Sequence, residues 1–278
     1  MIVNLDAVLK DAQKNHYAVG LFNTTDTDML EAAIAAAEEL RSPIVIGTAE
    51  VLLPFGELKL IAPSIIAAAK RATVPVVVHY DHGLTFDRCM EALQLGFSSV
   101  MFDGSVNPYE ENIKQTREIV KIAHSFGATV EGEIGHVGQA AAGDDHDVSL
   151  YTTVEQAQSY VASTGVDALA ISIGTAHGKY VKTPKLDFQR LREIRANLDT
   201  PLVLHGGSGL SDDDFRTCVR DGIAKLNIFT DLCVAGERAM AEGLSDGLAY
   251  LEIRNRKVEA IKETVKRKME LFSSARRA

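Results

Sequence analysis

The stretch Val74-Pro75-Val76-Val77-Val78-His79-Tyr80-Asp81-His82-Gly83 joins a strand to reactive side chains. Its first seven residues are mostly apolar and β-branched, which predicts a buried strand of a parallel sheet. Asp81 and His82 follow side by side at the carboxyl end of that strand. A strand that carries a carboxylate and an imidazole to its end predicts a functional site there.

Two later strand-like segments also lead to histidines. Residues 169–174 precede His177, and residues 202–204 precede His205, and each histidine is followed by glycine. Three neutral imidazoles with an open fourth position are typical of a catalytic zinc site. We therefore predict that His82, His177 and His205 bind one zinc ion.

The remaining histidines are predicted to have other roles. His79 lies two residues before Asp81 and is predicted to be a structural hydrogen-bonding partner. Four further histidines in helix ends or loops are predicted to face solvent: His16, His124, His136 and His146.

Eight strand-like segments alternate with helical ones, which predicts either a doubly wound sheet or a (β/α)8 TIM barrel, both of the α/β class. The predicted strands are 17–22, 43–47, 74–80, 98–102, 128–134, 168–174, 201–204 and 224–229. We predict the barrel, because the candidate residues follow strands three to eight and converge only in a closed ring. The prediction is one domain over residues 1–278, with an amino-terminal helix at 5–15 and a carboxyl-terminal helical extension at 230–278. The helix at 58–71 is expected to be broken early by Pro63.

Composition narrows the possible partners and location. The 278 residues carry a net charge of −9 with no basic cluster before the last few residues, which argues against nucleic acid. No apolar run reaches the roughly 18 residues of a membrane span. The amino terminus has no signal-peptide pattern, and Cys89, Cys218 and Cys233 are scattered, so we expect a cytoplasmic protein with no membrane association.

A phosphate site is predicted after the last two strands. Gly206-Gly207-Ser208-Gly209 follows one strand, and Thr230 follows the next and would begin a helix. Such turns and helix starts present N–H groups to anions, and these two loops often bind phosphate in barrels. Carboxylates at other strand ends can carry protons or bind a cation: Asp81, Asp103, Glu131 and Glu133.

In combination, these segments resemble class II, zinc-dependent ketose-bisphosphate aldolases, which include fructose- and tagatose-bisphosphate aldolases. The matching segments span nearly the whole chain: 79–83, 100–105, 130–135, 177–180, 204–209 and 225–228. The resemblance implies a Zn²⁺ cofactor and a sugar-phosphate substrate, with dihydroxyacetone phosphate and an aldehyde as the two halves. It also implies a homodimer or homotetramer.

Particular roles also follow from the resemblance. It implies that His82, His177 and His205 bind zinc and that Asp81 gives a proton to the aldehyde oxygen. Asp103 and Glu133 match a second position for a divalent or monovalent cation. The residues expected to hold dihydroxyacetone phosphate are Gly178, Lys182, Gly206, Gly207, Ser208, Asn227 and Thr230. The amide of Asn227 is also expected to stabilise the developing enediolate charge.

One loop departs from the family pattern. Residues 135–150 lack the usual glycine-glutamate-aspartate run and contain Gln139-Ala140-Ala141-Ala142-Gly143-Asp144-Asp145 instead. This difference indicates a substrate other than fructose 1,6-bisphosphate. The base that removes the carbon-bound proton is predicted to be Asp144 or Asp145, because the loop is long and acidic and can close over the substrate.

Two alternatives remain open on the sequence. A barrel with the same metal site could be a hydrolase or a non-catalytic sugar-phosphate binder. An aldolase that forms a Schiff base is the third possibility, because Lys225 lies on the eighth predicted strand.

Overall fold

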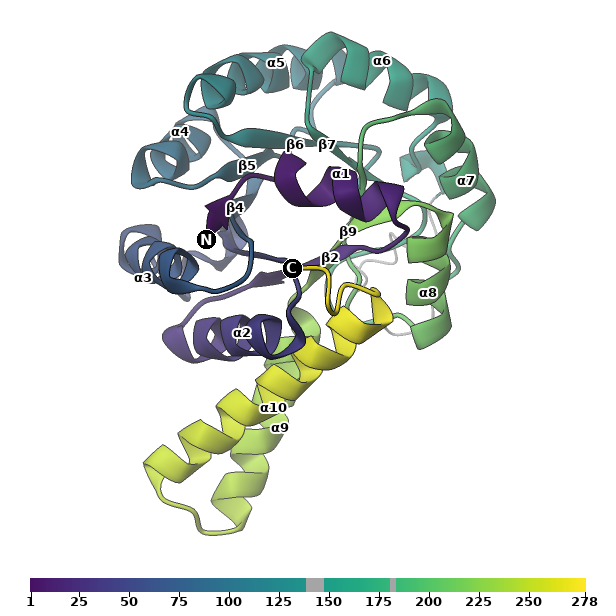
Figure 1. The fold of residues 1–278 in the computed structure, drawn as a ribbon. Coiled ribbons are helices and arrows are strands. Elements are labelled where there is room, and N and C mark those ends of the chain that lie inside the picture. Colours follow the sequence, from purple (N-terminus) through teal and green to yellow (C-terminus); the bar gives the residue numbers. More distant parts are fainter. Residues whose placement is uncertain (139–147, 181–183) are drawn as a thin grey trace.

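The computed structural model describes residues 1–138, 148–180 and 184–278. Eight parallel strands form a closed ring with helices around its outside (Figure 1), so the predicted (β/α)8 barrel is confirmed. The strands pair in chain order from β2 to β9, and the pairing of β9 with β2 closes the ring. The ring strands are β2 (Val19–Asn23), β3 (Ile44–Ala49), β4 (Val76–Gly83), β5 (Ser99–Phe102), β6 (Thr129–Ile134), β7 (Ala168–Ile171), β8 (Leu202–Leu204) and β9 (Ile223–Ile228).

The helices bury one face against the ring and expose the other. The α-helices in the described part of the chain are α1 (Asp6–Lys14), α2 (Thr27–Leu40), α3 (Leu58–Arg71), α4 (Phe86–Leu95), α5 (Tyr109–Ser125), α6 (Val154–Thr164), α7 (Phe188–Asn197), α8 (Asp212–Asp221), α9 (Thr230–Ser245) and α10 (Tyr250–Leu271). The larger hydrophobic core lies between this layer and the strands. All three cysteines lie in helices and are unpaired.

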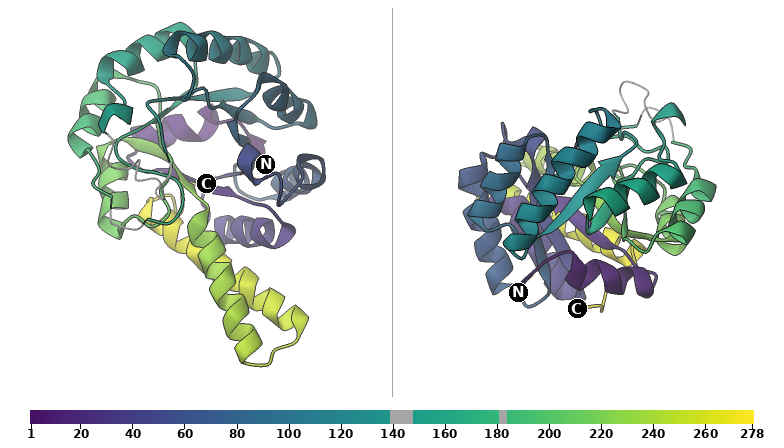
Figure 2. Two further views of the ribbon diagram at one scale, coloured as in Figure 1. Left: turned by 180° about the vertical axis from the view of Figure 1, so that it is seen from behind. Right: turned by 90° about the horizontal axis from the view of Figure 1, so that it is seen from above.

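Helix α1 closes one end of the barrel. Its apolar face, which includes Leu5, Val8 and Leu9, packs with inward-facing strand residues such as Val19 and Val77. Both chain termini lie at this end (Figures 1 and 2). The strands begin at the closed end, so their carboxyl ends and the following loops surround the opposite, open end, where barrel enzymes carry their sites.

A short strand, β1 (Ile2–Val3), was not predicted. It pairs with Val76 and Val77 at the beginning of β4, whereas β5 pairs with β4 only from His79 onward. Two residues are too few to show a strand period in the sequence.

The prediction that Pro63 breaks a helix was wrong. Helix α3 runs without interruption from Leu58 to Arg71 and contains Pro63 in its second turn. A proline there removes one backbone hydrogen bond. Burial of the apolar face, including Ile61, Ile65 and Ala69, outweighs that loss.

The carboxyl-terminal region is a hairpin of two helices. Helices α9 and α10 lie side by side and project away from the barrel (Figure 1), with residues 246–249 between them. The second half of α10 returns to the barrel, where Ile261, Val265 and Met269 are buried. Ion pairs of Lys257 with Asp28 and of Lys266 with Glu39 join α10 to α2. No described helix is long and apolar enough to span a membrane.

Candidate active site

A bulge in β4 brings Asp81 and His82 to the same cavity. Neighbouring residues of a regular strand point to opposite faces. Here the register with β5 shifts between Tyr80 and Gly83, and His82 takes a left-handed backbone conformation with φ of 45°. Bulges of this kind redirect side chains next to active sites. Both side chains therefore face the open end of the barrel.

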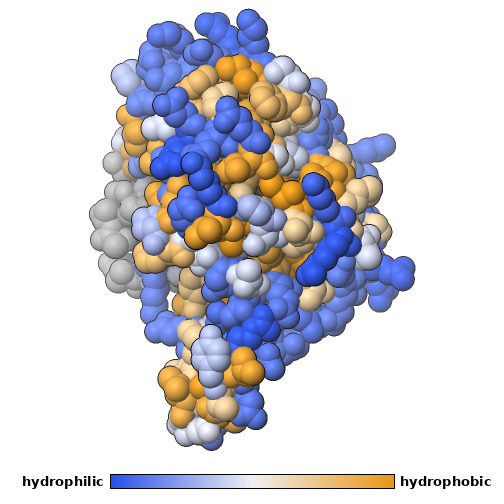
Figure 3. Space-filling view, turned by 90° about the vertical axis from the view of Figure 1, so that its left-hand side faces the viewer, coloured by the Kyte–Doolittle hydropathy of each residue, from blue (hydrophilic) through white to orange (hydrophobic). Residues whose placement is uncertain are grey.

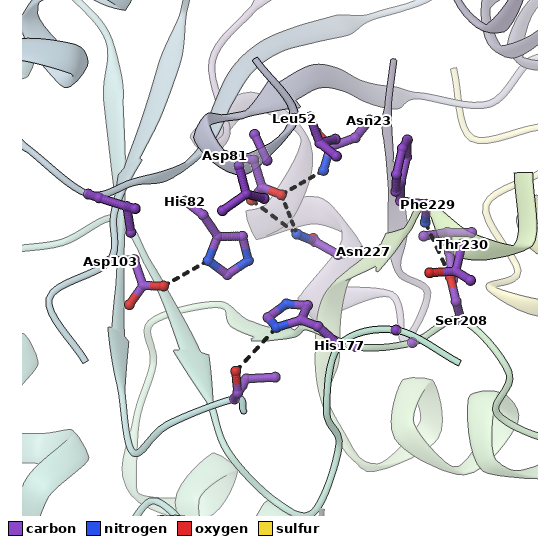
Figure 4. Close-up of a pocket in the computed structure, with 18 of the residues that line it drawn as sticks. Asn23, Leu52, Asp81, His82, Asp103, His177, Ser208, Asn227, Phe229 and Thr230 are labelled. Carbon is purple, nitrogen blue, oxygen red and sulfur yellow. Dashed lines mark hydrogen bonds and ion pairs between the residues drawn. The ribbon is translucent and has the colours of Figure 1, made fainter. Parts of the chain in front are cut away.

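The three predicted metal ligands meet there. One ligand atom from each of His82, His177 and His205 lies within 4.8 Å of the other two. Nδ1 of His205 is 2.8 Å from Nε2 of His82. Nε2 of His177 is buried and has no hydrogen-bond partner among the described residues. Figure 4 shows the rings of His82 and His177 next to each other in the cavity, with their planes at 81°.

The other ring nitrogen of each histidine contacts an oxygen. Nδ1 of His82 lies 2.9 Å from Oδ2 of Asp103, and Nε2 of His205 lies 2.7 Å from Oε1 of Glu131. Nδ1 of His177 lies 3.2 Å from the backbone oxygen of Val137. Such outer contacts orient metal-binding imidazoles and select the tautomer whose lone pair faces the ion.

The charges around the imidazoles favour a cation. Burial lowers the pKa of His177 to about 3 and also lowers that of His205, so both rings keep their lone pairs at neutral pH. Burial opposes protonation of His82 as well, but the carboxylates of Asp81 and Asp103 raise its pKa to about 10. His177 and His205 therefore offer neutral imidazole donors, and the carboxylates beside His82 favour a positive charge there, which a bound cation would supply in place of the ring proton. This donor set fits a zinc ion.

Asp81 is held by two amides. Its Oδ2 accepts a hydrogen bond from Nδ2 of Asn23 at 2.7 Å, and both its oxygens accept from Nδ2 of Asn227 at 3.1 and 3.2 Å. Burial raises the pKa of Asp81, but the charge of His82 and the ring of His79, whose Nε2 lies 3.7 Å from Oδ1 of Asp81, hold that pKa well below its usual range. The sequence analysis missed Asn23, although a polar residue at the end of a predicted strand was the available signal.

Lys225 does not face the cavity. Its side chain is fully buried, and Nζ lies 2.8 Å from Oε2 of Glu131 and 2.8 Å from Oδ1 of Asn227. It supports Glu131, which contacts His205, and it orients the amide of Asn227 toward Asp81. This position disfavours the Schiff-base alternative, because the amine is enclosed by two acceptors.

Two loops meet at the predicted phosphate corner. Oγ of Ser208, after β8, accepts hydrogen bonds from the backbone N–H groups of Phe229 and Asp231, after β9. Helix α9 begins at Thr230, so its N–H groups lie at this corner. Gly206 also lets the loop after β8 approach the loop after β7: its φ is +64°, and a Cβ there would lie 2.5 Å from the backbone oxygen of Ala176.

Comparisons with known proteins identify the family of this chain. The sequence model described as "Fructose-bisphosphate aldolase class-II" matches residues 3–277. The chain belongs to the class II fructose-bisphosphate aldolase family.

Relatives of this aldolase differ in the substrates that their names give. It is 38% identical to the 6-phospho-5-dehydro-2-deoxy-D-gluconate aldolase of Shouchella clausii over 99% of this chain and 96% of the relative. It is 35% identical to a fructose-bisphosphate aldolase of Staphylococcus aureus over 100% of this chain and 99% of that relative. The crystal structure of the YdjI aldolase from Escherichia coli K12 matches with a TM-score of 0.91 and 35% identity over the full length of both chains.

Membership of this family shows that the chain is a lyase, and it favours an aldolase over the hydrolase or the non-catalytic binder considered above.

A cavity of about 400 Å³ lies at the open end of the barrel and is lined by Asp81, His82 and His177. His205 is fully buried. The predicted substrate-binding residues that line the cavity are Gly178, Gly206, Gly207, Ser208, Asn227 and Thr230. Lys182, Asp144 and Asp145 lie outside the described residues.

The predictions for the other histidines had mixed outcomes. Nδ1 of His79 lies 2.8 Å from Oγ of Ser99, which confirms a hydrogen-bonding role. His16 and His124 are exposed as predicted, and His146 lies outside the described residues. The prediction for His136 was wrong: it is half-buried, lines the cavity and contacts Ser105. It lies two residues after the end of β6, in the loop as predicted, but this part of the loop turns its side chain into the cavity.

The second predicted cation position forms a separate group. Asp103 and Glu133 approach each other and His82 closely enough to share an ion. Oε1 of Glu133 accepts the N–H of Val137, whereas Oε2 has no partner among the described residues. Burial and the neighbouring charge of Asp103 raise the pKa of Glu133 well above its usual range.

Proposed function

We propose that this aldolase is zinc-dependent and joins dihydroxyacetone phosphate to an aldehyde, or cleaves the resulting ketose phosphate. The observation that carries the proposal is the convergence of three oriented imidazoles beside the buried carboxylate of Asp81. Bound at His82, His177 and His205, zinc would supply a Lewis acid for the oxygens of dihydroxyacetone phosphate.

The phosphate of dihydroxyacetone phosphate would occupy the corner between the loops after β8 and β9. Ser208 accepts two backbone hydrogen bonds, which leaves its hydroxyl proton to donate to a phosphate oxygen. The first N–H groups of α9 add a partial positive charge. The glycines at 178, 206 and 207 allow the ligand to approach the backbone. Lys182 stays a predicted phosphate ligand.

Asp81 would transfer the proton at the aldehyde oxygen. In the cleavage direction its carboxylate accepts the hydroxyl proton, and in condensation the carboxyl returns it to the new alkoxide. Asn23 and Asn227 hold the carboxylate in place by donating to it. The amide of Asn227 would also donate to the oxygen on which negative charge develops.

Exchange of the carbon-bound proton of dihydroxyacetone phosphate tests this function before any aldehyde is added. We expect the zinc-loaded enzyme to exchange that proton with deuterium oxide, as measured by NMR. Treatment with a chelator should stop the exchange, and added zinc should restore it. A zinc-loaded enzyme without exchange would contradict the proposed function.

The same assay tests the carbon base. Asp144 and Asp145 stay the predicted candidates, since Glu131 is enclosed by Lys225 and His205. We expect the Asp144→Ala, Asp145→Ala double variant to exchange about 10²–10⁴-fold more slowly than the parent, the usual contribution of a general base. The two single variants identify which aspartate acts. Exchange at the parent rate in the double variant would make Glu133 the next candidate.

We also propose that two or more copies associate through the tip of the α9–α10 hairpin. Leu244, Tyr250 and Leu251 are largely exposed there, and Figure 3 shows apolar residues at the projecting tip. Clusters of exposed apolar residues commonly mark interfaces between proteins. A monomeric mass in sedimentation equilibrium would contradict this proposal.

The cytoplasm, where phosphate esters are retained, stays the proposed location of the protein.

A further inference from the structure

We propose that the aldehyde partner of this aldolase carries no phosphate group. The inference rests on the proposed function, because it takes the corner near Ser208 as the site of the phosphate of dihydroxyacetone phosphate. It concerns the opposite end of the same cavity, where the aldehyde must lie.

The order of the strands places the two ends opposite each other. The phosphate corner is built by the loops after β8 and β9, and the loops after β4 and β5 lie across the eight-stranded ring from them. Figure 4 shows Ser208 and Thr230 at one end of the cavity and Asp103 at the other, with His82 and Asn227 between them. A substrate anchored by its phosphate near Ser208 therefore extends toward β4 and β5.

The side of the cavity built by the loops after β3, β4 and β5 has an apolar wall. Its members come from the loops after three successive strands: Val51 and Leu52 after β3, Leu84 after β4 and Val106 after β5. Val51, Leu84 and Val106 are 61%, 48% and 74% exposed. Scattered exposed apolar residues are ordinary, but these line one cavity, and apolar lining is typical of ligand sites.

A carboxylate behind the wall holds two of its loops together. Glu50 begins the short 3-10 helix η1 (Glu50–Leu52), which follows β3. Its Oε2 accepts the backbone N–H of Leu84 at 2.8 Å and the hydroxyl of Tyr80 at 3.2 Å. These bonds join η1 to the end of β4. The wall therefore has an acidic support, with no cation in these contacts.

The charges at this end oppose a phosphate. Among the described residues that line the cavity there is no lysine or arginine, and the carboxylates are Asp81 and Asp103. Recognition of a phosphate needs cationic side chains or converging N–H groups, as at the Ser208 corner. A second phosphate next to Asp103 would meet a like charge and gain no such partner from the described wall residues.

A matched pair of aldehydes tests the proposal. We expect kcat/KM for condensation with dihydroxyacetone phosphate to be about tenfold or more higher for glyceraldehyde than for glyceraldehyde 3-phosphate. Val51→Lys places a cation in the wall and should shift this ratio toward the phosphorylated aldehyde. Leu60→Lys is the control, because Leu60 is similarly exposed on α3 but does not line the cavity. That variant should keep the parent ratio.

The outcomes separate this inference from the function on which it rests. A parent enzyme that exchanges the proton of dihydroxyacetone phosphate but uses glyceraldehyde 3-phosphate as well as glyceraldehyde overturns only the inference. An unchanged ratio in Val51→Lys also counts against the wall as the aldehyde site. Absence of proton exchange in the zinc-loaded parent removes the proposed function itself.

Discussion

Replacement of His205 by alanine is expected to abolish both zinc binding and aldolase activity. The variant keeps only His82 and His177 of the three converging imidazoles, and two ligands leave the coordination shell incomplete. It also removes the contact between Nε2 of His205 and Oε1 of Glu131. Metal analysis of the purified protein after dialysis against zinc, together with the proton-exchange assay, measures both effects.

Two further measurements make this result specific. His124→Ala is the matched control, because His124 is exposed on α5, away from the cavity, and this variant should bind zinc like the parent. The thermal unfolding transition of His205→Ala shows whether the barrel is still folded. One equivalent of tightly bound zinc in folded His205→Ala would disprove the assignment of the three histidines.

Replacement of Asp81 by alanine is expected to preserve zinc binding but to reduce the rate of ketose cleavage by about 10²–10⁴-fold, the usual contribution of a general acid–base group. The carboxylate accepts hydrogen bonds from Asn23 and Asn227 and points into the cavity, where a substrate hydroxyl can reach it. Its loss removes the group that accepts the hydroxyl proton. The three imidazoles and their outer oxygen contacts remain.

The two half-reactions distinguish proton transfer from a structural defect. Because Asp81 is assigned to the aldehyde oxygen, Asp81→Ala should keep most of the proton exchange of dihydroxyacetone phosphate while losing cleavage. Asn23→Ala provides a comparison, since it removes one donor to Asp81 but leaves the carboxylate. We expect a smaller loss of cleavage there. Cleavage by Asp81→Ala at the parent rate would reduce Asp81 to a structural neighbour of His82.

The fold followed from local patterns because the barrel repeats one local unit. The buried parallel strands are short and mostly apolar runs, and the helices carry an apolar stripe of helical period. Helix α3 has the predicted limits, 58–71, and Ser211 caps α8 with Asp214 as its partner. The errors arose where tertiary contacts decide, as at Pro63 and β1.

The sequence predicted which residues lie in the site, but it did not predict the contacts between them. Parallel strands deliver their carboxyl ends to one side of a sheet, so strand ends alone pointed to His82, His177 and His205. The partners of these residues were found only in the structure. Glu131 contacts His205 from a strand 74 residues away, and Asn23 reaches Asp81 from the first strand of the ring.

By itself, the sequence determined the class of fold, the family and the convergence of the three histidines, since these depend on residue types at local spacings. Only the tertiary structure decided how these groups are arranged in space. The bulge at His82 turns two neighbouring side chains into one cavity, because a shift of register cancels the alternation of a regular strand. The apolar wall likewise forms only when ring closure brings three separate loops to one end of the cavity, since no local pattern relates Val51, Leu84 and Val106.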